Sequence, residues 1–259
     1  MLLALGDDVF APLLEDSLLG AGVLLHRVRS EKPTGAALIC VSDDAENAIT
    51  VAQGANSSLR PEDLPDLSGI AALLLQLETP IDTVTSYAKA ARAAGVRVIL
   101  NAAPAQTLAA DLLAAVDILV VNEEELAAVA GREGSIHELL ISLDLPCVIA
   151  TLGARGACMI DDGTFLLQPA FQVSPVDTTA AGDTFCGVLA ATLCHGHDLR
   201  LALRAACAAA ALATTRAGAQ SSIPERVEVE GLLKDGVEIA VSDFNLAVHC
   251  GLAPGTPTS

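Results

Sequence analysis

From residue 64 onward, short apolar runs alternate with segments of helical periodicity, and this alternation constrains the fold more than any other feature of the chain. The apolar runs cover residues 71–77, 96–100, 118–121 and 148–151. Strands that alternate with helices are typical of consecutive βα units around a parallel sheet. The sequence therefore predicts an α/β fold with a mostly parallel sheet.

Helices are predicted between and after these runs from the spacing of their apolar residues. Their expected ranges are 83–94, 123–130, 182–193 and 199–215. The first two end at Gly95 and Gly131, because glycine readily closes a helix in the left-handed conformation. The segment Asp161-Asp162-Gly163 separates two further apolar runs and predicts a hairpin turn.

The first 60 residues follow another pattern. They predict a helix over 8–19 and an antiparallel pair of strands over 36–41 and 48–52, in a small separate sheet.

After Pro224 the alternation decays. The apolar stretches 237–241 and 244–248 match no expected element, and whether they replace a strand of the sheet stays open. Residues 254–259 are predicted to form a frayed tail.

Composition and charge exclude several classes of function. Hydrophobic residues make up 52% of the chain but aromatic residues only 2%, so the core must consist mainly of Ala, Leu and Val. The 32 acidic and 14 basic residues give a formal net charge of −18. Binding to a nucleic acid backbone or an anionic membrane surface needs a basic surface, so neither is an expected partner.

Seven cysteines are scattered without a Cys-x-x-Cys pair, which fits neither a disulfide framework nor a zinc cluster. Reduced cysteines indicate a cytoplasmic location. The first residues lack the basic and apolar regions of a secretory signal, and no apolar stretch reaches the roughly 18 residues of a membrane span.

Polar residues follow the predicted parallel strands at the point where each strand ends. Glu78, Asn101, Asn122 with Glu125, and Thr151 occupy these positions. The carboxyl ends of parallel strands meet at one edge of the sheet, where ligands bind. The alternative interpretation is that these residues only end strands and cap the helices that follow.

The segment 177–183 places small residues at the start of a helix. Such a helix start presents unpaired backbone N–H groups and suits an anion. Asp183 would place a carboxylate beside that anion, as a base for phosphoryl transfer to a hydroxyl. Alternatively, Asp183 only complements the helix dipole.

Six segments in order resemble the ribokinase family of carbohydrate kinases, also called the PfkB family. They are Leu75-Gln76-Leu77-Glu78, Asn101-Ala102-Ala103-Pro104-Ala105, Asn122-Glu123-Glu124-Glu125, Thr151-Leu152-Gly153-Ala154-Arg155-Gly156, Asp177 to Asp183, and Arg216 to Pro224. The similarity runs from Gly6 to about Pro224. It implies a three-layer α/β/α sandwich and an enzyme that phosphorylates D-ribose to ribose 5-phosphate with ATP, Mg²⁺ and K⁺.

The resemblance also implies roles for individual residues. Asp183 would be the base that contacts the sugar hydroxyl, Ala181 and Gly182 the anion hole, and Glu78 a ligand of the sugar hydroxyls. The residues implied for the nucleotide and Mg²⁺ are Asn122, Glu125, Thr151, Gly153, Arg155, Gly156 and Cys207, although Cys207 fits packing better than chemistry. The residues implied for K⁺ are Asp177, Thr179, Ala213, Arg216, Gly218 and Ser222. An ordinary helix cap at Gly218 is the alternative for the last loop.

The chain departs from the family at its start. Members begin with a strand that carries a sugar-binding Asp, followed by lid strands and a Gly-Gly-x-x-x-Asn segment, and the resemblance begins after all of these. We therefore expect an N-terminally truncated kinase domain over 1–224, with the remnant of a small antiparallel lid over 33–53. A divergent segment would follow over 225–259. Family dimers pair through the lid, so a homodimer is doubtful here.

Three alternatives stay open from the sequence. The chain could be a nucleotide-binding remnant that holds no sugar, or a kinase of another free sugar or a nucleoside, or the incomplete gene model of a longer protein. An acidic Glu78 without a nearby basic cluster favours a neutral sugar over one that is already phosphorylated.

Overall fold

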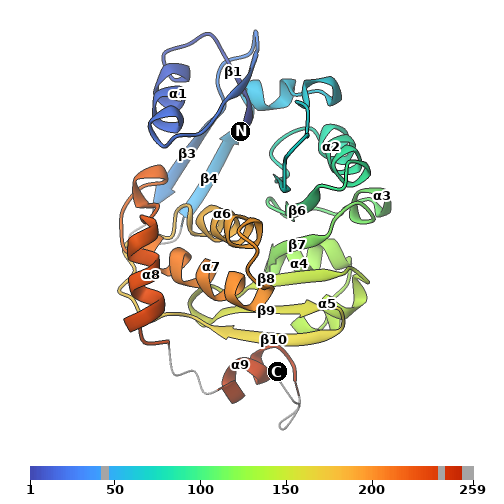
Figure 1. Ribbon diagram of the computed structural model, residues 1–259, viewed down its shortest axis with the longest axis vertical. Helices are drawn as coiled ribbons and strands as arrows, with labels where there is room; N and C mark the ends of the chain where they lie inside the picture. The colour runs from blue at the N-terminus through green and yellow to red at the C-terminus, as the bar shows by residue number, and fades with distance from the viewer. Residues whose placement is uncertain (42–46, 239–242, 253–259) are drawn as a thin grey trace.

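The computed structural model describes residues 1–41, 47–238 and 243–252, and its centre is a six-stranded sheet (Figure 1). The strand order is β10-β9-β8-β7-β6-β5. The strands are β5 (Ala72–Leu75), β6 (Arg97–Asn101), β7 (Ile118–Asn122), β8 (Cys147–Thr151), β9 (Gly156–Asp161) and β10 (Thr164–Pro169). β5 to β8 pair in parallel, and β9 and β10 form the antiparallel hairpin that Asp161-Asp162-Gly163 predicts.

Helices cover both faces of this sheet, so the predicted α/β/α sandwich is confirmed. On β7, Leu119 and Val121 face one core cluster, and Ile118 and Val120 face the other, as the two-residue period of a strand requires. The first cluster contains residues from α2 (Ile81–Ala93), α3 (Ala110–Leu113), α4 (Glu123–Ala130) and α5 (Ile136–Ser142). The second contains residues from α6 (Ala181–Cys194), α7 (Leu199–Ala213) and α8 (Arg226–Asp235).

The N-terminal region contains a pair of strands that the sequence did not predict. β1 (Leu2–Leu5) and β2 (His26–Arg29) pair in parallel as their own two-stranded sheet, with α1 (Ala11–Gly20) between them. The predicted helix start at Asp8 is wrong. The Asp8 carboxylate instead accepts hydrogen bonds from the N–H groups of Phe10 and Ala11, at 3.0 and 3.2 Å, so it precedes the helix.

The predicted antiparallel pair is confirmed as β3 (Ala36–Val41) and β4 (Asn47–Ala52), which form a third, separate sheet. Leu38 and Val51 are 69% and 49% exposed on it. Two short 3₁₀ helices, η1 (Gly54–Ser58) and η2 (Pro61–Asp63), lead from this hairpin to the main sheet.

The region after Pro224 is more ordered than the sequence predicts. It forms α8, a bridge between Phe171 and Glu238, and α9 (Asp243–His249), so residues 244–248 belong to a helix and replace no strand. Residues 239–241 of the other apolar stretch and the predicted tail over 254–259 lie outside the described residues. Figure 1 shows α9 beside β10 at the bottom of the view. Within the described ranges, no helix is both long and apolar enough to cross a membrane.

Truncation of a central side chain of the aliphatic core should lower the free energy of unfolding strongly. Leu119, on β7, is fully buried. We expect Leu119→Ala to lower the free energy of unfolding by about 2–5 kcal/mol, because it leaves a cavity. Leu38→Ala is the matched control on an exposed side chain, with an expected change below about 0.5 kcal/mol. Urea denaturation measures both, and equal losses would contradict the burial described here.

Tyr87 of α2 contacts the segment around η2 and can be observed directly by absorbance. It is the only tyrosine, and the chain has no tryptophan. Its hydroxyl donates to the carbonyl oxygen of Arg60 at 2.7 Å, and burial, followed by the charges of Asp63 and Glu62, raises its pKa to about 12. The neutral Tyr87 hydroxyl therefore contributes to the free energy of unfolding. This contribution is complete below the unfolded pKa of about 10 and is lost as the pH rises towards about 12. Phenolate absorbance during alkaline titration should show this shift. A midpoint near the free value in the folded protein would contradict the packing.

Candidate active site

The carboxyl ends of the parallel strands bring the predicted polar residues to one edge of the sheet. Asn122 and Thr151 are register partners at the ends of β7 and β8. The Thr151 hydroxyl donates to the carbonyl oxygen of Val121 at 3.3 Å. Glu78 follows β5 at the same edge, and α6 packs against β5 and α7. Asn101 ends β6 between these strands.

Glu78 and Asp183 lie close enough for their charges to interact. Loss of solvent raises the pKa of Glu78 first, and the negative charge of Asp183 raises it further. Asp183 and Glu125 both contribute, after burial, to the raised pKa of the Cys186 thiol on α6. The carboxylates of Glu78, Glu125 and Asp183 are therefore near one another. Glu78 follows β5, Glu125 lies on α4, and Asp183 lies in the first turn of α6.

The start of α6 is open to a ligand. The residue before the helix, Ala180, has a left-handed conformation with φ of +60°, and no side chain caps the helix. The N–H of Ala181 already donates to the carbonyl of Thr178 at 3.2 Å. Among the described residues, the N–H groups of Gly182 and Asp183 have no protein acceptor, and the space beside the Gly182 Cα is open. Two donors therefore face outward at the positive end of the helix.

Asn122 and Glu125 form a reciprocal cap at the start of α4. The Asn122 side chain accepts from the Glu125 N–H, and the Glu125 carboxylate accepts from the Asn122 N–H, both at 2.8 Å. This is the helix-capping arrangement that was the alternative interpretation of the sequence. Burial raises the pKa of Glu125, while the Asn122 N–H opposes that rise. One carboxylate oxygen of Glu125 takes part in the cap.

A cavity of about 370 Å³, here called the β7–β8 cavity, lies beside these residues. Its lining consists of Asn122, Glu123, Glu124 and the segment from Thr151 to Arg155. Gly153, with φ of +56°, opens the short turn Gly153–Arg155. Gly156 closes the turn with φ of +112°, and a Cβ there would lie 2.1 Å from the carbonyl oxygen of Gln168. Gly156 is therefore required by the backbone beside the cavity.

The predicted cation loop joins the segments before α6 and after α7. The Asp177 carboxylate accepts from the N–H groups of Thr179 and Gly218, each at 2.9 Å. The Thr179 side chain, followed by the Gly218 N–H, lowers the pKa of Asp177. Ala213 is the last residue of α7, and Ser222 is fully buried nearby in the chain. The Arg216 guanidinium pairs with Glu228 of α8.

Cys207 does not line the β7–β8 cavity. It lies on α7 in the core cluster with Leu189 and Leu203. Burial, followed by the charge of Glu238, raises the pKa of its thiol to about 12, so it is protonated at neutral pH. Its surroundings are those of a packing residue.

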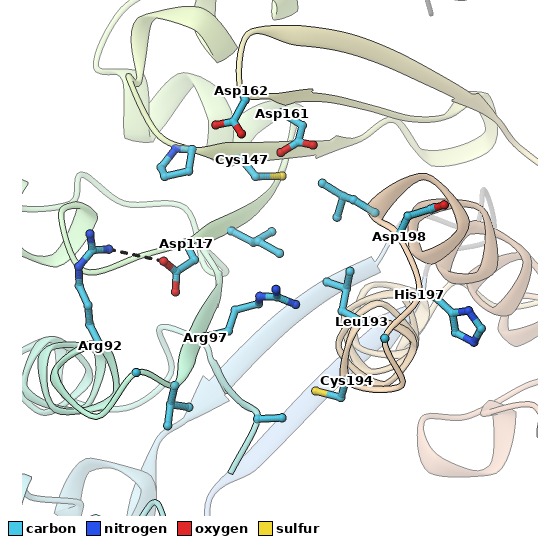
Figure 2. A pocket seen from close by; sticks show the side chains of 17 residues that line it. Arg92, Arg97, Asp117, Cys147, Asp161, Asp162, Leu193, Cys194, His197 and Asp198 are labelled. Atoms are coloured by element: carbon cyan, nitrogen blue, oxygen red, sulfur yellow. Dashed lines mark ion pairs between the residues drawn. The ribbon is translucent and has the colours of Figure 1, made fainter. Parts of the chain in front are cut away.

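A larger cavity of about 880 Å³, here called the opposite-edge cavity, lies at the amino ends of the parallel strands (Figure 2). Asp117, Asp161 and Asp162 line it from the sheet, and His197 and Asp198 from the turn between α6 and α7. The cavity also contains two arginines, of which Arg92 is paired with Asp117 at 3.5 Å. None of the predicted site residues lines this cavity.

Two contacts at the candidate site join residues that sequence reasoning did not connect. Glu123, known from the sequence only as part of the segment Asn122-Glu123-Glu124-Glu125, forms an ion pair with Arg155 at 2.7 Å. It also contacts His249 of α9 at 3.1 Å. These residues are 32 and 126 positions from Glu123, and no local pattern relates them.

Comparison with known proteins places this geometry in a family. The sequence model of the pfkB family carbohydrate kinases matches residues 1–226. A ribokinase of Haemophilus influenzae is 35% identical over 237 residues, which cover 86% of this chain and 78% of the relative. A ribokinase of Arabidopsis thaliana is 36% identical over 251 residues, which cover 89% of this chain and 66% of the relative.

Solved structures agree with the sequence relatives. The crystal structure of ribokinase from Thermotoga maritima has a TM-score of 0.82 at 35% identity and covers 90% of this chain and 80% of its own. The structure of Arabidopsis thaliana ribokinase complexed with ribose and ATP has a TM-score of 0.80 at 31% identity, with coverages of 89% and 80%. The matched residues include every strand of the six-stranded sheet and the start of α6. The chain therefore belongs to the pfkB family of carbohydrate kinases.

Proposed function

We propose that this protein transfers the γ-phosphoryl group of ATP to the primary hydroxyl of D-ribose and forms ribose 5-phosphate. Relatives named ribokinase at about 35% identity support the reaction, and the Arabidopsis thaliana ribokinase structure with ribose and ATP supports both substrates. The observation that carries the proposal is the closeness of Asp183 to Glu78 beside the uncapped start of α6. This arrangement suits a neutral alcohol that loses a proton while a phosphate gains charge.

In this reaction, Asp183 accepts the proton of the attacking hydroxyl as the oxygen–phosphorus bond forms and the bond to ADP breaks. The outward N–H groups of Gly182 and Asp183 stabilise the charge that develops on the phosphoryl oxygens. Ala181 contributes by its small size, since its own N–H is occupied within the turn. Glu78 accepts hydrogen bonds from ribose hydroxyls, a role that suits a carboxylate better than a basic residue.

The nucleotide would occupy the β7–β8 cavity. Asn122 and Thr151 line it and would face the phosphates, and the Gly153–Arg155 turn, which Gly156 closes, forms part of its wall.

Mg²⁺ usually binds through one or two carboxylates, several waters and the substrate phosphates. Glu125 fits such a site, since one oxygen takes part in the cap and a second oxygen can hold a metal-bound water. No group of three or more His, Cys, Asp or Glu side chains in the described part of the chain could hold a metal alone. This agrees with a metal that arrives with ATP. When bound, Mg²⁺ would neutralise phosphate charge.

We also propose a K⁺ site in the loop that Asp177 organises. Backbone carbonyls at a helix end suit a cation, and the contact between Asp177 and Gly218 holds the two loop segments together. The proposed oxygen donors are Asp177, Thr179, Ala213, Arg216, Gly218 and Ser222, with Arg216 acting through its backbone because its guanidinium pairs with Glu228.

For the domain organisation, we propose a kinase domain over 1–224 with the β3–β4 hairpin, within 33–53, as its lid. Residues 225–259 would form a divergent C-terminal segment, in which α8 and α9 pack against the core clusters of the domain. A cytoplasmic location is supported by the free thiols of the cysteines whose side chains the structure describes.

Ribose-dependent formation of ADP from MgATP tests the proposed reaction. Wild-type protein should form ADP only when ribose is present, and faster with K⁺. Asp183→Asn should lower kcat by about 10² to 10⁴-fold while ADP affinity stays the same, because it removes the proton acceptor. Asp235→Asn, on the exposed end of α8, is the matched control and should leave turnover unchanged. Full turnover by Asp183→Asn would refute its role as base. If wild-type protein binds ADP but shows no ribose-dependent turnover, it is a nucleotide-binding protein instead.

Glu78→Gln tests the sugar side separately. Loss of a charged acceptor should raise KM for ribose by about 10- to 100-fold, since a hydrogen bond to a charged group contributes roughly 1.5–3 kcal/mol. KM for ATP should not change. Glu133→Gln is the control on an exposed glutamate that is not among the proposed site residues. An unchanged KM for ribose, or an equal rise in KM for ATP, would show that Glu78 does not bind the sugar.

A further inference from the structure

The C-terminal helix α9 lies outside the family match, which ends at residue 226, and yet it reaches the β7–β8 cavity. His249, at the end of α9, places its Nε2 3.1 Å from one carboxylate oxygen of Glu123. The other oxygen of Glu123 lies 2.7 Å from a guanidinium nitrogen of Arg155. Glu123 and Arg155 both line the cavity. His249 is not a lining residue itself, but it contacts the lining residue Glu123.

Packing holds the end of α9 in this place. Leu246, Cys250 and Leu252 are almost fully buried in the core cluster that faces α4 and α5. The carbonyl oxygen of Cys250 accepts from the N–H of His137 at 2.9 Å. Gly251 has φ of +85°, and a Cβ there would lie 2.3 Å from the Cβ of Ser135 in the turn before α5.

The Cys250 thiol lies near the Cys158 thiol of β9, on the sheet side of the same core cluster. The charges of Glu123 and Arg155 also act on Cys250. The end of α9 is therefore seated against β9 and α5 next to the cavity.

We propose that His249 is a positioning residue for the nucleotide, acting through Glu123 and Arg155. This inference rests on the proposed function, because it assigns the nucleotide to the β7–β8 cavity. Glu123 carries a negative charge at the wall of a cavity that would hold a polyphosphate, and such charges repel each other. His249 and Arg155 hold the two oxygens of that carboxylate. The same contacts fix Arg155, and with it the turn that shapes the wall.

ADP titration by calorimetry tests this role without relying on turnover. His249→Ala should weaken ADP binding by about three- to fivefold, the range expected when a partly exposed hydrogen bond is lost. His249→Gln should restore the affinity to within about twofold, because its amide can donate to Glu123. His197→Ala, on the exposed turn between α6 and α7 at the other edge of the sheet, is the matched control and should bind ADP as the wild type does.

A double-mutant cycle identifies the route of the effect. In a Glu123→Gln background, His249→Ala should cause no further loss of ADP affinity, since the pair is already broken. In the kinetic assay, His249→Ala should raise KM for ATP and leave KM for ribose and kcat unchanged. If α9 had a purely structural role, the substitution would instead change KM for ATP, KM for ribose and kcat together.

The outcomes separate this inference from the proposed function. If the wild type binds ADP and His249→Ala binds it equally well, the positioning role is refuted. The same conclusion follows if the loss persists in the Glu123→Gln background. If the wild type binds ADP with the predicted dependence on His249 but does not phosphorylate ribose, the reaction is refuted and the positioning role is retained. A wild type that binds no ADP would refute both.

Discussion

The parallel pairing of β5 to β8 is the constraint on which the candidate site depends. In this pairing the carboxyl ends of the four strands meet at one edge, so Glu78, Asn122 and Thr151 are brought together although they are far apart in the chain. The N-terminus of α6 lies at the same edge, and α6 covers the face of the sheet opposite to the face that α4 covers. The Asp177 carboxylate then ties the segment before α6 to the loop after α7 through the Thr179 and Gly218 N–H groups. Loss of the parallel register would separate every proposed catalytic group from the others.

A chain with a formal net charge of −18 must bind a polyphosphate at an edge that is itself acidic. Most side chains at this edge are carboxylates, so the favourable interactions must come from elsewhere. Backbone N–H groups at the uncapped start of α6 are one source, and Arg155 is another. Glu125 and Glu123 are each held by donors, Glu125 by the cap of α4 and Glu123 by Arg155 and His249. Their charges are thereby partly compensated before any substrate arrives.

The sequence predicts the parts of this molecule that local patterns determine. The apolar runs place the four parallel strands within one or two residues, and the spacing of Asn122 and Glu125 indicates the start of α4. β1 was not predicted because its residues, Leu-Leu-Ala-Leu, show no two-residue alternation, and β2 was not predicted because it reads His-Arg-Val-Arg. Long-range contacts escaped for a different reason. The pair of Glu123 with His249 leaves no trace in any short window of sequence, and only the family resemblance assigned Asp177 and Gly218 to one site.

A crystal structure of the protein with MgADP and ribose is the most direct test of the active site. We expect the terminal phosphate of ADP beside the N–H groups of Gly182 and Asp183, the rest of the nucleotide in the β7–β8 cavity, and the ribose hydroxyl within hydrogen-bond distance of Asp183 and Glu78. Nucleotide density in the opposite-edge cavity, or ribose out of reach of Asp183, would contradict the assignment.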